Sequence, residues 1–192
     1  MSGVEWIATV FGVLCVALAA ARSMWTFPTG IVSVTLLGIV VFEERLYSDT
    51  LLQAFFVAAN IYGWRNWSVS SARSGEIPIG WMDGAARWRW CVGIVAASVL
   101  WGFGMHRVTD ASYPWWDAGI AAASVAAQIL MAQRRIEHWL LWIAVDLGSI
   151  PLYAAKGLYL FAGLYVLYLA LSLGGLAGWL RAMRLPGRAV AA

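Results

Sequence analysis

The chain has 192 residues and a formal net charge of +3; 62% of its residues are hydrophobic and only 12% are charged. Soluble domains average about 25% charged residues. This composition, with a mean hydropathy of +0.73, excludes a soluble globular protein and indicates an integral membrane protein.

Seven segments are apolar enough to cross a bilayer, which takes roughly 20 helical residues. In chain order they are 4–21, 24–42, 46–64, 90–105, 115–133, 137–155 and 158–180. No basic leader precedes the first one, so we interpret it as a retained span and not a cleaved signal peptide. The stretch 65–90 is the one long polar connection. The sequence therefore predicts an all-α membrane protein with seven transmembrane helices.

The basic residues are distributed unevenly between the two sides of the predicted bundle. With seven spans, ten of the thirteen fall on one side: Arg22, Arg65, Arg73, Arg87, Arg89, Arg134, Arg135, Arg181, Arg184 and Arg188. The other side holds Arg45, Arg107 and Lys156. Cytoplasmic loops carry an excess of Lys and Arg, which predicts an outside N-terminus and a cytoplasmic C-terminus. This asymmetry explains the positive charge without a nucleic-acid partner.

A weak internal repeat divides the chain around the fourth span. Leu46-Tyr47 opens the third predicted helix and Leu158-Tyr159 the seventh, at an offset of 112. Gly63-Trp64 and Gly178-Trp179 close the same two helices. The repeat predicts a first three-helix bundle (1–67), a cytoplasmic loop with a linker helix (68–110) and a second three-helix bundle with a short tail (111–192). In transporters built from parallel repeats, the substrate lies near the midplane between the halves.

Asp146 is the clearest candidate for function, since a charged side chain at membrane depth is costly and usually faces a cavity or a partner. Trp139, Trp142 and Asp146 fall at i, i+3 and i+7, on one helix face. Indole faces attract cations and flat rings. The face therefore suits a flat, positively charged heterocycle. The alternative is a structural ion pair of Asp146 with Lys156 or an arginine.

The third predicted helix carries three polar or aromatic residues on one face, Gln53, Asn60 and Trp64. Amides can pair with sugar hydroxyls or ring substituents, or they can simply hydrogen-bond between helices. The two histidines, His106 and His138, stand at span ends, where we expect them to be solvated.

Motifs for several other classes of protein are missing from the sequence. It contains no GxxxxGK[ST] phosphate loop, no HExxH, no G-x-S-x-G and no clustered Cys/His set. We therefore expect neither an enzyme nor a cofactor or metal. A membrane enzyme using Asp146 as acid or base, and a non-transporting assembly subunit, remain the competing classes.

The stretches "FFVAANIYGWRNWS" and "HWLLWIAVDLGSIPLY...KGLYLFAGLY" resemble the PnuC family of bacterial vitamin transporters. The resemblance covers about Trp25 to Trp179. It implies a 3+1+3 fold related to the SWEET sugar transporters, in a homotrimer in the lipid of the bacterial inner membrane. It also implies uptake by facilitated diffusion, with a cytoplasmic kinase trapping the substrate. The substrate would stack on Trp139 and Trp142, and Gln53, Asn60 and Trp64 would form the other wall.

The resemblance makes nicotinamide riboside the expected substrate and thiamine the alternative. In nicotinamide riboside carriers of the family, the residue four positions after the second tryptophan tends to be asparagine, whereas this chain has Asp146. Both vitamins carry a positive charge on an aromatic ring, so the acid suits either one. Riboflavin is neutral and suits it less well.

Overall fold

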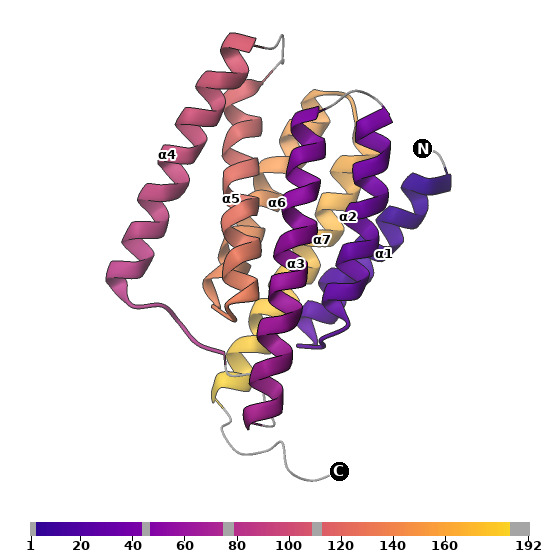
Figure 1. Cartoon of the computed structure of the whole chain (residues 1–192). Helices are drawn as coiled ribbons and strands as arrows, with labels where there is room; N and C mark the ends of the chain where they lie inside the picture. Colours follow the sequence, from indigo (N-terminus) through magenta and orange to yellow (C-terminus); the bar gives the residue numbers. More distant parts are fainter. Residues whose placement is uncertain (1–2, 44–46, 75–78, 109–112, 185–192) are drawn as a thin grey trace.

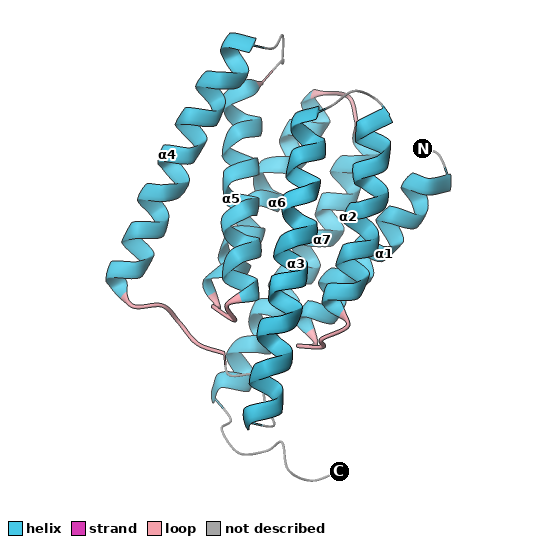
Figure 2. Cartoon of the chain, in the orientation of Figure 1, coloured by secondary structure: helices cyan, strands magenta, loops and turns pink. Residues whose placement is uncertain are grey.

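The computed structural model describes residues 3–43, 47–74, 79–108 and 113–184. Its regular structure consists of helices alone within those ranges (Figure 2). The helices are α1 (Gly3–Ala20), α2 (Thr26–Glu43), α3 (Tyr47–Ser74), α4 (Gly84–Val108), α5 (Pro114–Ala132), α6 (Glu137–Ala155) and α7 (Tyr159–Arg184). The predicted all-α fold with seven helices is confirmed.

The helices form two sets of three with α4 at one side (Figure 1). α1, α2 and α3 pack in chain order, and so do α5, α6 and α7. The two sets, here called the first and second triplet, meet where α1 packs on α7 and where α3 packs on α5. Among the described helices α4 packs closely on α5, and it reaches α6 through an ion pair of Arg87 with Glu137. This arrangement is consistent with the predicted 3+1+3 order.

The odd-numbered helices all run toward the same end of the bundle, the end at which α7 stops at Arg184 (Figure 1). We call this the basic end, because its described residues include Arg22, Arg87, Arg134, Arg135, Arg181 and Arg184. The described basic residues at the opposite end are Arg107 and Lys156. Both triplets therefore have the same orientation, as a parallel repeat requires.

Within the described part of the chain, four helices, α1, α2, α4 and α7, are long and apolar enough to cross a membrane by length and composition. Of the other three, α5 and α6 bury much of their surface against neighbouring helices, and α3 has a polar C-terminal part. Helix α6 shows this best, since it buries Glu137, His138, Asp146 and Ser149 against protein. A helix surrounded by protein does not need an all-apolar surface, which is why hydropathy is a weaker signal there.

The expected long connection over 65–90 is largely wrong. Helix α3 continues through Ser74 and α4 already begins at Gly84. Hydropathy falls where the polar residues begin, but backbone hydrogen bonding continues past that point. The start of α4 has a sequence signal that hydropathy ignores: the Asp83 carboxylate accepts a hydrogen bond from the Ala86 N–H at 2.7 Å, as an N-cap residue does.

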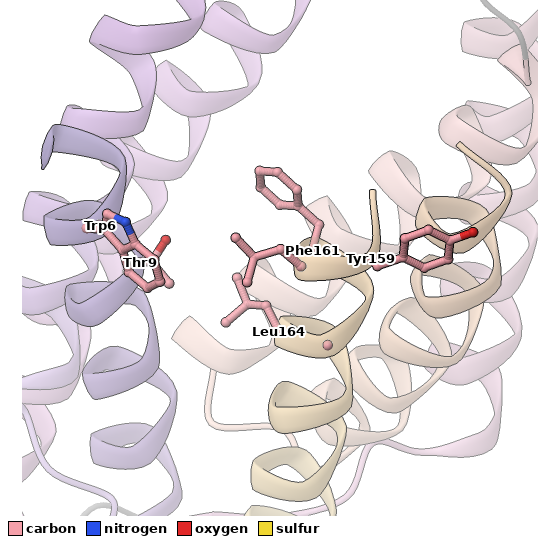
Figure 3. Close-up of a pocket in the computed structure, with 7 residues that line it drawn as sticks. Trp6, Thr9, Tyr159, Phe161 and Leu164 are labelled. Carbon is pink, nitrogen blue, oxygen red and sulfur yellow. The ribbon is translucent and has the colours of Figure 1, made fainter. Parts of the chain in front are cut away.

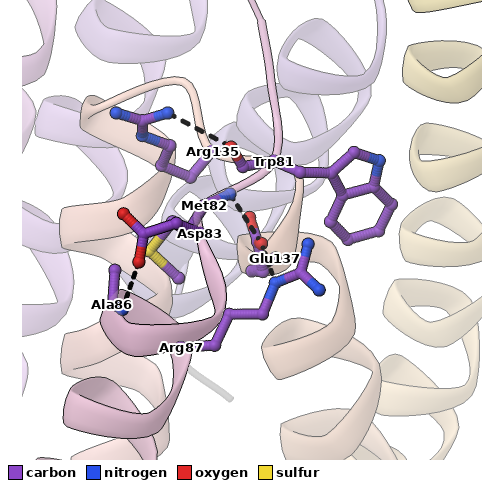
Figure 4. A network of polar contacts seen from close by, with 7 residues as sticks. All are labelled: Trp81, Met82, Asp83, Ala86, Arg87, Arg135 and Glu137. Carbon is purple, nitrogen blue, oxygen red and sulfur yellow. Dashed lines mark hydrogen bonds and ion pairs between the residues drawn. The ribbon is translucent and has the colours of Figure 1, made fainter.

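The segment before α4 is fastened to the turn between α5 and α6 (Figure 4). Gly80 donates its N–H to the Arg134 carbonyl and accepts one from Ile136. The Glu137 carboxylate accepts hydrogen bonds at 2.8 Å from the Met82 N–H and from Arg87 Nε. These contacts hold the start of the linker helix against the second triplet, in addition to the packing of α4 on α5.

We expect Glu137→Ala to lower the thermal stability of the protein more than Glu137→Gln. Glutamine keeps an acceptor for Met82 and loses only the ion pair with half-exposed Arg87, which contributes at most about 1 kcal/mol. Alanine leaves the Met82 N–H without its partner, at roughly 1–3 kcal/mol. Thermal unfolding in detergent would measure both variants. Equal losses would mean that the ion pair, and not the Met82 contact, is the important interaction.

The internal repeat is more exact in the structure than in the sequence. The same offset of 112 places α2 on α6 and α3 on α7 with their first residues aligned to within one position. Among the described residues other than glycine, positive φ occurs at Arg22 (57°) and Arg134 (61°), which stand at this offset too. The match of Gly63-Trp64 to Gly178-Trp179, with its offset of 115, was the wrong register. The structure pairs Trp67 with Trp179 instead.

Candidate functional site

Asp146 lies in the middle of α6 and is 3% exposed. Its carboxylate accepts a hydrogen bond from the Ser172 hydroxyl of α7 at 3.0 Å. Among the described residues no cation lies within ion-pair distance of it. Lys156 instead contacts Asp117 at 3.0 Å, at the end of the bundle that lies opposite the basic end. The alternative of a structural pair between Asp146 and Lys156 is therefore wrong.

The two tryptophans before Asp146 have different surroundings. Trp139 is 1% exposed, and its indole packs against His138 and Trp179, with ring centroids at 4.5 and 6.0 Å. Trp139 Nε1 is buried without a hydrogen-bond partner. Trp142 is only partly buried and packs at the edge of the same cluster. Of the two indoles, Trp142 is the more accessible to a ligand in this conformation.

Close packing fixes the position of the Trp139 ring against α7. A Cβ atom added at Gly175 would lie 2.4 Å from Trp139 Cη2. Real Cβ atoms do not approach other atoms so closely, so only glycine at this position admits the indole. The sequence carries no local sign of this requirement, because Gly175 stands in an ordinary apolar helix.

The three candidates of α3 do not converge on one point. Asn60 is buried at the middle of the helix, and its Oδ1 has no hydrogen-bond partner while its Nδ2 donates to the Phe56 carbonyl. Gln53 is half-buried beside Gly38 of α2. Trp64 is 43% exposed. Asn60 therefore faces the interior, Gln53 a groove between α2 and α3, and Trp64 the outer surface.

Sequence reasoning missed two residues of the interior. His138 was expected to be solvated but is fully buried between Trp139 and Trp179. Its Nδ1 contacts the Arg135 carbonyl at 2.6 Å. The other missed residue is Ser172, the partner of Asp146. The offset of the repeat makes Ser172 the counterpart of Asn60, so the repeat could have identified it.

Two open grooves lined by described residues border the bundle, and neither encloses Asp146. One, of about 240 Å³, lies between α1 and α7 (Figure 3); Trp6, Thr9, Phe161 and Leu164 are among the residues that line it. The other, of about 440 Å³, lies between α2 and α3 and includes Gln53. The first is almost entirely apolar, which suits lipid better than a polar solute.

Comparison with known proteins places the chain among characterised membrane proteins. Residues 2–181 match the family described as nicotinamide mononucleotide transporter. The nicotinamide riboside transporter PnuC of Escherichia coli (strain K12) is 31% identical, covering 97% of this chain and 89% of that one. The riboflavin/roseoflavin transporter RibM of Streptomyces davaonensis is also 31% identical, over 97% of this chain and 88% of its own.

The fold also matches a solved structure. The crystal structure of the vitamin B3 transporter PnuC superposes with a TM-score of 0.77 at 24% identity, covering 94% of this chain and 82% of that one. The structural likeness supports the seven-helix fold, and the matched family and its relatives define the protein as a membrane transporter. It is a multi-pass protein of the bacterial inner membrane and not an enzyme. The chain belongs to the nicotinamide mononucleotide transporter family, as the match over residues 2–181 shows.

Proposed function

We propose that this protein takes up nicotinamide riboside by facilitated diffusion, with the vitamin's ring held beside Trp142 and Asp146 near the membrane midplane. The observation that carries the proposal is the buried Asp146 without a cationic partner among the described residues. A buried carboxylate is costly unless it is paired. A substrate with a positively charged ring would supply the missing charge.

The aromatic surroundings suit the same substrate. Trp142 lies one helical turn from Asp146 on the same face of α6. Its partly accessible indole can stack on a flat cationic ring, which contributes roughly 0.5–2 kcal/mol. Trp139 lies one turn further toward the basic end, where it would form the floor of the site. Its unpartnered Nε1 gives that floor a hydrogen-bond donor.

Residues of α3 would form the opposite wall of the proposed site. Asn60 is the best placed of them, because its unpartnered Oδ1 is an acceptor for a ribose hydroxyl. Gln53 and Trp64 would meet the substrate only along its path, since one lines the groove beside α2 and the other lies at the outer surface. We therefore expect a smaller effect on affinity from Gln53→Ala than from Asn60→Ala.

The absence of a nucleotide-binding motif in the sequence favours transport without a pump. Net uptake then needs a reaction that consumes the substrate inside the cell, and a cytoplasmic kinase would provide it. We infer a cytoplasmic basic end, and hence an outside N-terminus, from the positive-inside rule. Assembly as a homotrimer in the lipid bilayer belongs to the same proposal.

Ligand titration of the purified protein, followed by tryptophan fluorescence or calorimetry, tests the proposal. Nicotinamide riboside, thiamine and riboflavin would be compared side by side. We expect saturable binding of nicotinamide riboside. Binding of thiamine alone would favour the alternative, a thiamine transporter. Binding of riboflavin alone would contradict the role of Asp146 as a counter-charge and would place the protein's activity closer to that of RibM.

A further inference from the structure

The interior at the basic end is closed by aromatic side chains from both triplets. Trp67, Trp139, Trp179 and Phe27 are at most 1% exposed. They belong to one buried cluster, to which helices of both triplets contribute. Its members are Ala19, Phe27, Trp67, Met131, Ile136, Trp139 and Trp179. A solute on the axis of the bundle would have to pass this cluster to leave at the basic end.

The cluster contains the same hydrogen bond twice. Trp67 Nε1 donates to the Met131 carbonyl at 3.3 Å, and Trp179 Nε1 donates to the Ala19 carbonyl at 3.0 Å. The offset of the repeat relates the two donors and also the two acceptors, with the triplets exchanged. The two indoles also contact each other, with ring centroids 5.9 Å apart. They therefore meet close to an approximate two-fold axis that relates the triplets.

Each indole is held by its own triplet and bonds to the other one. Trp67 of α3 packs edge-on against Phe27 at 5.0 Å, and Trp179 of α7 packs edge-on against Trp139 at 6.0 Å. Phe27 and Trp139 are again equivalent positions of the repeat. The hydrogen bonds, in contrast, join α3 to α5 and α7 to α1. Those are the two helix contacts through which the triplets meet.

We propose that Trp67 and Trp179 form the gate at the basic end. Their two equivalent indole–carbonyl hydrogen bonds hold the triplets together there. The inference rests on the proposed transport function and adds to it the residues that must separate. The triplets cannot move apart at this end without breaking both indole–carbonyl bonds and the contact between the two rings. Since the two hydrogen bonds are equivalent, loss of either one favours the open gate to a similar extent.

Replacing each tryptophan by phenylalanine keeps an aromatic ring and removes the N–H donor. The readout is the rate at which Cys15, one helical turn from Ala19 on α1, reacts with a charged methanethiosulfonate added at the basic end of the protein in vesicles. Exposed Cys91 is first replaced by alanine. We expect Trp67→Phe and Trp179→Phe each to raise the rate roughly three- to tenfold, the effect of one lost hydrogen bond. Trp101→Phe, on the exposed surface of α4, is the matched control.

A cross-link tests the same gate by holding it closed, whereas the phenylalanine variants favour its opening. A Cβ atom at residue 178 would lie 3.8 Å from the Ala20 carbonyl, so Ala20→Cys and Gly178→Cys place two thiols across α1 and α7. In a background without Cys15 and Cys91, a short bifunctional methanethiosulfonate would hold this end closed. We expect nicotinamide riboside uptake to fall at least tenfold and to return after reduction. Binding in detergent should persist.

The two experiments distinguish a failure of the proposed gate from an error in the proposed substrate. Uptake that survives the cross-link would overturn the proposal of a gate. The cluster would then be a fixed contact about which the triplets move. Unchanged Cys15 labelling in both phenylalanine variants would also overturn it. The labelling experiment uses no substrate, so it tests the gate even if the uncross-linked protein does not carry nicotinamide riboside. A lack of nicotinamide riboside uptake by the uncross-linked protein would contradict the proposed function and leave the gate untouched.

Discussion

Asp146→Asn is expected to weaken binding of nicotinamide riboside by roughly 5- to 150-fold, equivalent to about 1–3 kcal/mol. The change keeps the size of the side chain and an oxygen that can accept the Ser172 hydroxyl, so the helix contact between α6 and α7 is retained. Only the negative charge is lost. A cationic ring in a site shielded from water would lose its counter-charge, and calorimetric titration would measure the difference.

Two comparisons make this expectation specific. Asp117→Asn removes an exposed carboxylate that pairs with Lys156 at the opposite end of the bundle, and should leave the affinity unchanged. Any weak binding of neutral riboflavin should not decrease in Asp146→Asn. If both Asp146→Asn and Asp117→Asn bind nicotinamide riboside like the parent protein, Asp146 is a structural residue that stabilises the contact between α6 and α7.

The sequence predicts the fold well where burial in lipid determines the pattern. Hydropathy predicts the seven helices, although among the described residues only four of them are apolar enough to cross a membrane by length and composition, and the cost of a charge in an apolar helix predicts the burial of Asp146. The polar end of α3 was missed because backbone hydrogen bonding continues beyond the apolar residues. Its Asn66 side chain even donates to the Ala132 carbonyl of α5 at 2.8 Å. A contact of that kind has no local signal in sequence.

The candidate site was predicted in part. Helical spacing correctly places Asp146 inside the bundle, and it puts Asn60 on the interior side of α3. It also groups Trp64 with Asn60, although Trp64 is exposed. Residues four positions apart share a face only approximately, and in α3 that face turns from the interior to the surface. His138 was assigned to solvent because span ends are usually wet, yet two tryptophans cover it.

Residue pairs of the repeat that match in sequence are not always equivalent in the structure. The Gly-Trp pairs match in sequence but have different surroundings. Gly63 and Gly175 are instead the equivalent glycines, because each lies under an aromatic ring, that of Phe27 in the first triplet and that of Trp139 in the second. Packing preserves this correspondence even where the aromatic residues differ.

Gly175→Ala is expected to destabilise the protein and to weaken ligand binding together. The added Cβ would stand 2.4 Å from Trp139 Cη2, so the indole must shift out of its place. Overpacking of this kind costs about 1–3 kcal/mol. The displaced ring can no longer form the floor of the proposed site. Thermal unfolding in detergent and titration with nicotinamide riboside would measure the two effects.

Two other glycines provide matched controls for this expectation. Gly174→Ala places the same methyl group where nothing lies within 4 Å, so neither stability nor binding should fall. Gly63→Ala would put its Cβ 2.3 Å from Phe27 Cε1, in the triplet without Trp139. It should lower stability like Gly175→Ala while leaving affinity near that of the parent. Equal loss of affinity in both would mean that general loosening of the bundle, and not the position of Trp139, weakens binding.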